Sequence, residues 1–176
     1  MQTLGFMLEL APDPVIGFEQ CETRRAAPCH RDAQKLLDFW NERGRVLVMG
    51  RDLPSRPIAR LLPNLAILDY RAARQDFRVR LAGFSLVRRF GRDIGQHYLS
   101  EVVPNRQFEG LRDLLMEARD TGVPLIQDIR IKSPMRPLLH YEMLLLRVLA
   151  VDLQNPLVLM GMFFFDRKKR TTAASA

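Results

Sequence analysis

The stretch FRVRLAGFSLVRRFGRDIGQ, from Phe77 to Gln96, changes its hydrophobic period part-way along its length. Before Gly83, apolar residues alternate with arginines, and this pattern predicts a β-strand with one apolar face and one face in water. The residues expected on the apolar face are Phe77, Val79 and Leu81. We interpret the arginines between them, Arg78 and Arg80, as the water-facing half of a sheet rather than as a nucleic-acid-binding strip.

Beyond Gly83 the apolar residues take up helical spacing, which predicts a short helix that ends at Gly91. The apolar side of this helix consists of Phe84, Val87 and Phe90. Gly83, Gly91 and Gly95 lie where the strand gives way to short helices, and each can adopt the positive φ that other residues avoid. We interpret these glycines as turn residues that make no ligand contact.

The segments around this stretch show the same two periods. Residues 65–71 (LAILDYR) predict a strand that forms a hairpin with the strand at 76–83, and residues 104–122 predict a long helix. The apolar stripe of the long helix is Phe108, Leu111, Leu114, Leu115 and Ala118. Three more strands follow without an intervening helix, at 124–132, 138–152 and 156–165. Helices segregated from an antiparallel sheet in this way indicate an α+β domain.

The last two strands are apolar on both faces, so the sheet needs a cover on its second side. The amphipathic helix at 32–43, with Asp32 as its N-cap and Gly44 after its last turn, is the nearest element without another partner. We therefore expect this helix, or its copy in a dimer, to pack on the outer face of the sheet. The residues expected at such an interface are Leu36, Leu37, Trp40, Leu144, Leu146, Val158, Met160 and Met162.

Length and composition are those of one globular domain with looser ends. With 176 residues, 47% of them hydrophobic, the chain can bury one core, and disorder cannot dominate it. We predict an N-terminal arm at 1–30, a domain at 31–166 that includes the N-terminal helix, and a flexible basic tail at 167–176. The net charge of +7 favours anionic partners. However, the arginines are spread over several elements and no nucleic-acid-binding motif occurs, which argues against nucleic acid as a partner.

Three further patterns restrict the class of protein. Cys21 and Cys29 form neither a disulfide framework nor, without a companion pair, a zinc site, so we expect a reduced, cytoplasmic protein without a metal site. No run reaches the ~18 uninterrupted apolar residues of a spanning helix, so no transmembrane segment is predicted. There is no Gly-x-Ser-x-Gly frame and no phosphate-binding loop, and the protein is therefore predicted not to be an enzyme.

The order of the elements and four segments of the sequence resemble the PAS domain. The closer resemblance is to a bacterial branch in which one such domain makes up most of a small chain. The segments are FW (39–40), ARLLPNLAILD (59–69), DFRVRLAG (76–83) and FGRDIGQ (90–96). The resemblance implies a five-stranded antiparallel sheet of order 2-1-5-4-3 with helices on one face. The N-terminal helix is then expected on the other face.

The chain differs from those PAS sensors whose cofactor requires a particular residue in the sequence. No cysteine occurs in 69–176, which argues against a flavin adduct, and no histidine occurs in the long helix, which argues against haem. We interpret His97 and His140 as lone polar residues rather than axial ligands. Asp166 stands where PAS domains often have an aspartate before an output helix, but no apolar heptads follow it here. The sequence names no cofactor.

The resemblance implies a non-enzymatic signalling or protein-interaction module that forms a homodimer or docks a regulatory signalling protein through its sheet. The alternative is a sensor that binds a small molecule in the cleft between sheet and helices, and a basic nucleic-acid-binding protein is the third reading. The residues expected to line the cleft are Phe84, Phe90, Tyr98, Phe108, Leu111 and Leu115. The other interpretation, which we favour for these residues, is that all six are plain core residues.

The covering role of the N-terminal helix can be tested by removing residues 1–44. The truncated protein should expose apolar strand residues, bind more of a hydrophobic dye than the whole chain and change its oligomeric state. Dye fluorescence and sedimentation measure both effects. A truncated protein that stays soluble, keeps its assembly and binds no additional dye would show that the helix covers nothing.

Overall fold

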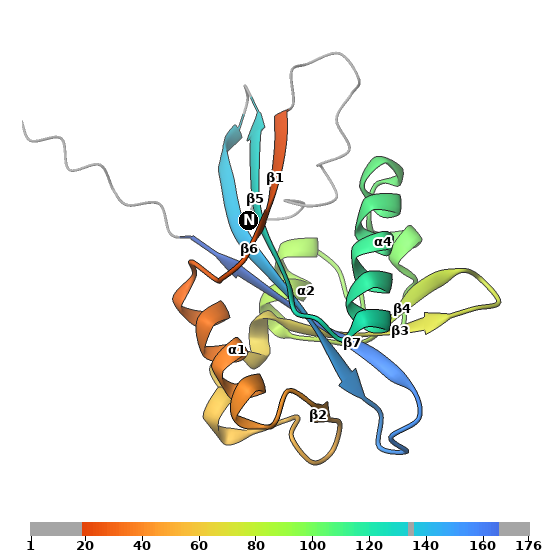
Figure 1. Ribbon diagram of the computed structural model, residues 1–176. Coiled ribbons are helices and arrows are strands. Elements are labelled where there is room, and N and C mark those ends of the chain that lie inside the picture. Colours follow the sequence, from red (N-terminus) through yellow and green to blue (C-terminus); the bar gives the residue numbers. More distant parts are fainter. Residues whose placement is uncertain (1–18, 134–135, 166–176) are drawn as a thin grey trace, which may run out of the picture.

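The computed structural model describes residues 19–133 and 136–165, which form one sheet with helices on both of its faces (Figure 1). The strands are β1 (Glu19–Arg25), β2 (Leu47–Val48), β3 (Leu65–Arg71), β4 (Asp76–Ala82), β5 (Leu125–Ser133), β6 (Arg136–Leu149) and β7 (Pro156–Phe164). The α-helices are α1 (Arg31–Glu42), α2 (Phe84–Phe90), α3 (Leu99–Val102) and α4 (Asn105–Thr121). Two short 3₁₀ turns, η2 (Arg56–Ile58) and η3 (Leu62–Asn64), precede β3.

The sheet has seven strands in the order β1-β5-β6-β7-β3-β4, and β2 pairs in parallel with β6 beyond the end of β5. All other neighbours are antiparallel. The five predicted strands are β3 to β7, and they follow the order 2-1-5-4-3 when numbered along the chain. This part of the prediction is confirmed. The structure adds β1 and β2, which the sequence patterns did not indicate.

β1 comes from the segment predicted as an arm. It lies along β5 from the pair Glu19–Lys132 to the pair Arg25–Ile126 and forms one edge of the sheet. The start of the arm (1–18) and the basic tail (167–176) lie outside the described residues. The predicted division of the chain at residues 30 and 166 therefore stays a prediction.

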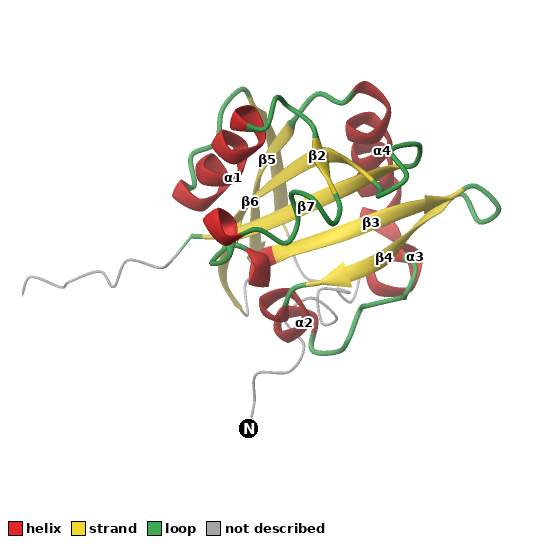
Figure 2. Ribbon diagram, turned by 90° about the horizontal axis from the view of Figure 1, so that it is seen from below, coloured by secondary structure: helices red, strands yellow, loops and turns green. Residues whose placement is uncertain are grey.

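The two faces of the sheet carry separate hydrophobic cores. Figure 2 shows α1 and α4 on opposite sides of the strands, so the predicted placement of the N-terminal helix on the outer face is confirmed. Alternate residues of β6 divide between the cores. Tyr141, Met143 and Leu145 belong to the inner core, under α2, α3 and α4. Leu144, Leu146 and Val148 belong to the outer core, together with Ala33, Leu36, Phe39 and Trp40 of α1.

A β-bulge changes which residues of β4 face inward. Leu68 pairs with Val79, but the preceding Ile67 pairs with Leu81, so Arg80 is the additional residue. Phe77 and Val79 are buried as predicted. The inward orientation predicted for Leu81 is wrong: after the bulge the side chain is 58% exposed.

The inward side of α2 also differs from the prediction. Leu86 and Phe90, one helical turn apart, are its buried residues. Val87 is only partly buried, and Phe84 is 68% exposed beside the guanidinium of Arg88. The assignment of Phe84 and Val87 to the apolar side was therefore wrong. The buried side of α2 lies about one position away from the predicted one, so that Leu86 is buried in place of Val87.

Only one of the three glycines in the opening stretch has a positive φ. Gly91, after α2, has φ 69°. Gly83 has φ −69°, and its requirement for glycine is steric: an added Cβ would lie 2.2 Å from the carbonyl oxygen of Leu62 and 2.4 Å from that of Pro63. Gly83 is thus correctly predicted from the sequence as a position that needs glycine, but the reason is the close approach of two carbonyl oxygens and not a positive φ.

A buried carboxylate fixes the start of α1. Glu142 on β6 is fully buried, and its two oxygens accept the backbone N–H groups of Cys29 (2.8 Å) and His30 (3.0 Å). His30, rather than Asp32, is the N-cap, because its Nδ1 accepts the Asp32 N–H. Its Nε2 lies 3.2 Å from the Phe164 carbonyl oxygen and donates to it. α1 is therefore tied at its first turn to both β6 and β7.

Replacing Glu142 tests this attachment. Glu142→Ala leaves two buried N–H groups without an acceptor and should lower the free energy of unfolding by about 3 kcal/mol. Glu142→Gln keeps one acceptor oxygen and should cost about 2 kcal/mol. Urea unfolding followed by circular dichroism measures both values. Glu42→Ala, at an exposed position of α1, is the control and should change the stability by less than about 0.5 kcal/mol. An equal effect of Glu142→Ala and Glu42→Ala would contradict the attachment.

Two glycine substitutions should act in opposite directions. Gly83→Ala forces Cβ against backbone oxygens that cannot rotate away, and we expect a loss of about 3 kcal/mol. Gly110→Ala, within α4, meets no atom within 4 Å and should stabilise the protein by about 1 kcal/mol because alanine favours the helix. Chemical denaturation of both variants provides the comparison. The steric explanation fails if Gly83→Ala is as stable as the parent.

Candidate functional site

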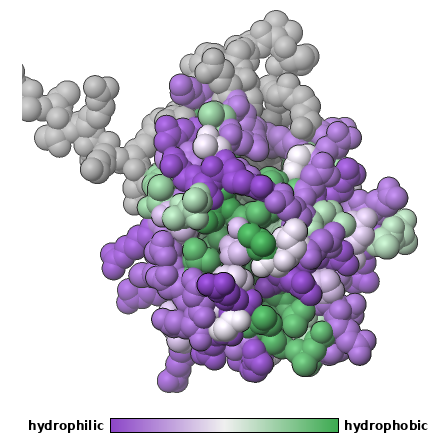
Figure 3. All heavy atoms as spheres, viewed as in Figure 1, coloured by the Kyte–Doolittle hydropathy of each residue, from purple (hydrophilic) through white to green (hydrophobic). Residues whose placement is uncertain are grey.

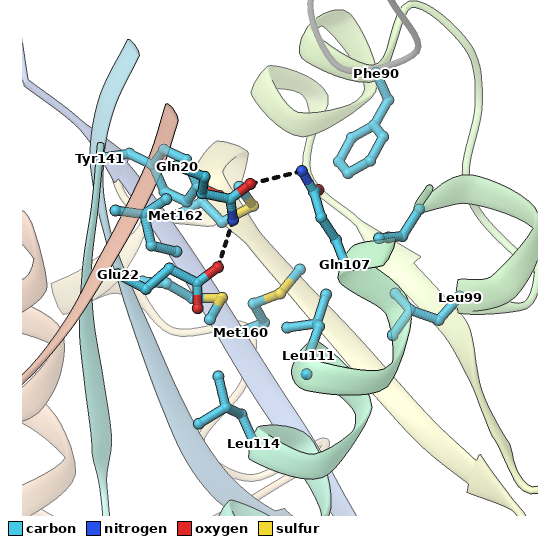
Figure 4. A pocket seen from close by; sticks show the side chains of 14 residues that line it. Gln20, Glu22, Phe90, Leu99, Gln107, Leu111, Leu114, Tyr141, Met160 and Met162 are labelled. Carbon is cyan, nitrogen blue, oxygen red and sulfur yellow. Dashed lines mark hydrogen bonds between the residues drawn. The ribbon is translucent and has the colours of Figure 1, made fainter. Parts of the chain in front are cut away.

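A pocket of about 450 Å³ lies between the inner face of the sheet and α4 (Figure 4). β1, β5, β6 and β7 form one wall, and α4 with the ends of α2 and α3 forms the other. The lining residues are Gln20, Glu22, Phe90, Leu99, Val103, Gln107, Gly110, Leu111, Leu114, Ile129, Tyr141, Met143, Met160 and Met162. Figure 3 shows hydrophobic side chains in the middle of the face seen in Figure 1, surrounded by hydrophilic ones.

The floor of the pocket is apolar and adaptable. Alternation along the strands places Met143 of β6 and Met160 and Met162 of β7 on the inner face, where all three are nearly buried. Thioether side chains are flexible and polarisable, so they adjust to differently shaped apolar ligands. On the opposite wall, Leu111 and Leu114 of α4 are only partly buried and line the pocket. Such a surface suits the body of a small apolar molecule.

One edge of the pocket is polar, and there β1 meets α4. The amide Nε2 of Gln107 donates to Oε1 of Gln20 over 2.8 Å, and Nε2 of Gln20 donates to Oε1 of Glu22 (Figure 4). Further along the same two elements, Arg24 forms a 2.6 Å ion pair with Glu117. These contacts connect the edge strand to the helix across the pocket.

Tyr141 adds a buried hydroxyl-bearing side chain to the lining. The residue is 6% exposed, and its ring is tilted against that of Phe164. Burial, with a smaller contribution from the charge of Glu22, raises the pKa of the Tyr141 hydroxyl well above its usual value. This hydroxyl therefore stays protonated and can donate or accept a hydrogen bond without carrying charge.

The comparisons with known proteins decide the family of this fold. A family model described as "PAS domain" matches residues 29–164. This chain belongs to the PAS domain family. PAS domains are generally non-enzymatic sensory or signalling modules, and they often mediate dimerisation or signalling interactions. Comparison with curated proteins gave no match.

The PAS match and the pocket do not have the same limits. The pocket is formed mostly by residues within 29–164, but Gln20 and Glu22 come from β1, which precedes the match. The polar edge of this PAS pocket is thus built partly from a strand outside the matched region.

Two of the six residues predicted for the PAS cleft, Phe90 and Leu111, line the pocket. Leu115 is fully buried in the inner core, and Phe108 packs against that core beside Arg112. Tyr98 is partly buried under the guanidinium of Arg74, 4.1 Å from the ring centre. Phe84 lies on the surface. Sequence reasoning missed Gln20, Glu22, Gln107 and Tyr141, since isolated polar residues in a strand or helix carry no recognisable pocket signal.

The residues predicted for an interface lie within the two cores. Leu36, Trp40, Leu144 and Leu146 are buried in the outer core, and Leu37 packs partly buried against it. Val158, Met160 and Met162 are buried in the inner core, two of them in the pocket floor. All eight are therefore covered within a single chain, and an interface that uses them stays a prediction.

The histidines interpreted as lone polar residues have partners. Nε2 of His140 lies 3.0 Å from Oδ2 of Asp128, and its ring stacks on Phe165. His97 lies 3.4 Å from Glu101. Burial on its own would raise the pKa of Asp128, but the hydrogen bond from His140 and the charges of His140, Arg130 and Arg25 lower it on balance. Residues 19–133 and 136–165 contain no cluster of three or more His, Cys, Asp or Glu suited to a metal ion.

The arginines of the opening stretch make contacts within the chain. Arg78 donates to Gln96, and Arg92 donates to the carbonyl oxygen of Glu101. The guanidinium of Arg89 lies over the ring of Phe164. These contacts are made from β4, from α2 and from the loop that follows α2, and they do not form one continuous strip. In the part of the chain that the structure describes, no helix is both long and apolar enough to cross a membrane.

Proposed function

We propose that this PAS domain is a sensory module that binds a small, mainly apolar molecule in the pocket between its sheet and α4. The observation that carries the proposal is the pocket itself. About 450 Å³ of space is lined by methionine, leucine and aromatic side chains, with a few polar groups at one edge. Concave, mostly apolar pockets with few, localised polar groups are the usual form of small-molecule sites.

The two covers on the sheet favour this function over docking through the sheet. α1 packs over the central strands of the outer face, and α2, α3 and α4 pack over the inner face. A partner or second copy that approached the centre of the sheet would first have to displace one of these covers. A small molecule needs no such rearrangement, since it enters space that is already present.

A filled pocket should lose the ability to bind an apolar probe. We expect saturable binding of the fluorescent dye N-phenyl-1-naphthylamine by the whole chain. The double variant Leu111→Trp/Leu114→Trp places two indoles in the pocket and should weaken this binding at least about tenfold, which corresponds to about 1.4 kcal/mol. Fluorescence titration at constant protein concentration measures the affinity.

The matched control places two tryptophans on the surface. Val123→Trp/Leu153→Trp changes two apolar residues that are 57% and 59% exposed and should leave dye binding unchanged. Dye that does not bind the whole chain, or that binds both double variants equally well, would refute the pocket as a ligand site. If the dye binds as expected, native mass spectrometry of the purified protein gives the mass of a retained natural ligand, which the filled variant should lack.

A further inference from the structure

The charge of the pocket is opposite to that of the chain. The protein has 27 Lys and Arg residues against 20 Asp and Glu, for a net charge of +7. Among the described residues that line the pocket there is no Lys, Arg or His, and the carboxylate of Glu22 is the only charged group. Tyr141, the other ionisable residue of the lining, stays neutral. An anionic ligand would therefore meet a like charge and no compensating cation.

The hydrogen bonds at the polar edge run in one direction. A carboxylate only accepts, so Gln20 must turn its NH₂ group toward Glu22 and its carbonyl toward Gln107. Gln107 in turn must donate its own NH₂ group to Gln20. The side-chain oxygen of Gln107 and the second oxygen of Glu22 remain, and in the described part of the chain no protein donor contacts either. Both ends of this edge therefore offer acceptors, and each of the two amides keeps a second N–H.

The acceptors depend on β1. Alternation in the strand points Gln20, Glu22 and Arg24 to one side, where Gln20 and Arg24 contact Gln107 and Glu117 of α4. Arg25 points to the other side and pairs with Asp128. Because β1 (Glu19–Arg25) precedes the PAS match at 29–164, Gln20 and Glu22 of this polar edge lie outside the matched region, and Gln107 lies within it.

We propose that β1 makes the pocket selective for an amphiphile whose head group donates hydrogen bonds, an ammonium above all, and that Glu22 discriminates against carboxylates. The apolar body of the ligand lies against Met143, Met160 and Leu111, and its head group lies at the polar edge, against the second oxygen of Glu22. This inference rests on the proposed ligand-binding function. It adds the chemical class of the ligand and the residue that selects it.

The test uses three probes with the same ten-carbon chain and different head groups. Decylamine, 1-decanol and decanoate, each below its micelle-forming concentration, compete with N-phenyl-1-naphthylamine for the whole chain at neutral pH. We expect decylamine to displace the dye at the lowest concentration and decanoate at the highest. In Glu22→Gln the ratio between the decanoate and decylamine midpoints should fall at least about fivefold, the effect of about 1 kcal/mol between unit charges near water.

Glu42→Gln is the matched control, because it removes the same charge from an exposed residue of α1 on the other side of the sheet, and its ratio should equal that of the parent. The inference is overturned if decanoate competes as well as decylamine, or if Glu22→Gln changes the ratio no more than Glu42→Gln does. In that case the dye still binds and the proposed function survives. A dye that does not bind the whole chain overturns the proposed function, and the selectivity with it.

Discussion

The contact on which the rest of this structure depends is the pair of hydrogen bonds between the carboxylate of Glu142 and the start of α1. A sheet with apolar residues on both faces of β6 and β7 is stable in water only if both faces are covered. Glu142 lies on the outer face and accepts the backbone N–H groups of Cys29 and His30. These bonds hold the first turn of α1 over the sheet, where Leu36 and Trp40 complete the outer core. A fully buried carboxylate is costly unless its oxygens are hydrogen-bonded, so Glu142 and the start of α1 stabilise each other.

The same contact also influences the pocket on the opposite face. Cys29 follows the end of β1 at Arg25 by only four positions. Fixing Cys29 above β6 therefore restricts where β1 can lie, and β1 pairs with β5 at the edge of the sheet. From this edge Gln20 and Arg24 reach across to α4. The N-terminal segment thus covers the outer face with a helix and borders the inner pocket with a strand.

This arrangement gives a PAS domain with an apolar pocket and an acidic, hydrogen-bond-accepting edge. The methionines of the floor adapt to shape and do not discriminate strongly between apolar bodies. In the proposed function, selectivity would come from the polar edge, where the Glu22 carboxylate accepts hydrogen bonds from the head group and repels anions. A ligand that bridges this edge would contact β1 and α4 together, and its binding would therefore act on both elements.

The sequence by itself determined the periodic elements of the fold. The strands β3 to β7, the helix α4 ending at Gly122, and the need for α1 on a doubly apolar sheet all follow from spacing of side chains along the chain. The spacing of side chains along the chain does not determine which residues of neighbouring strands pair. One additional residue at Arg80 turned Leu81 outward, and the phase of α2 buried Leu86 in place of Phe84.

Most of the pocket was decided by the tertiary structure. Phe90 and Leu111 could be assigned to it because they lie on apolar stripes. Gln20, Glu22 and Gln107 could not, because a polar residue at the surface of a strand or helix looks the same in the sequence whether it faces water or a partner. β1 has no apolar alternation of its own, and its position comes from backbone pairing with β5 and from the attachment at Glu142. These are contacts between residues more than a hundred positions apart, which no local pattern records.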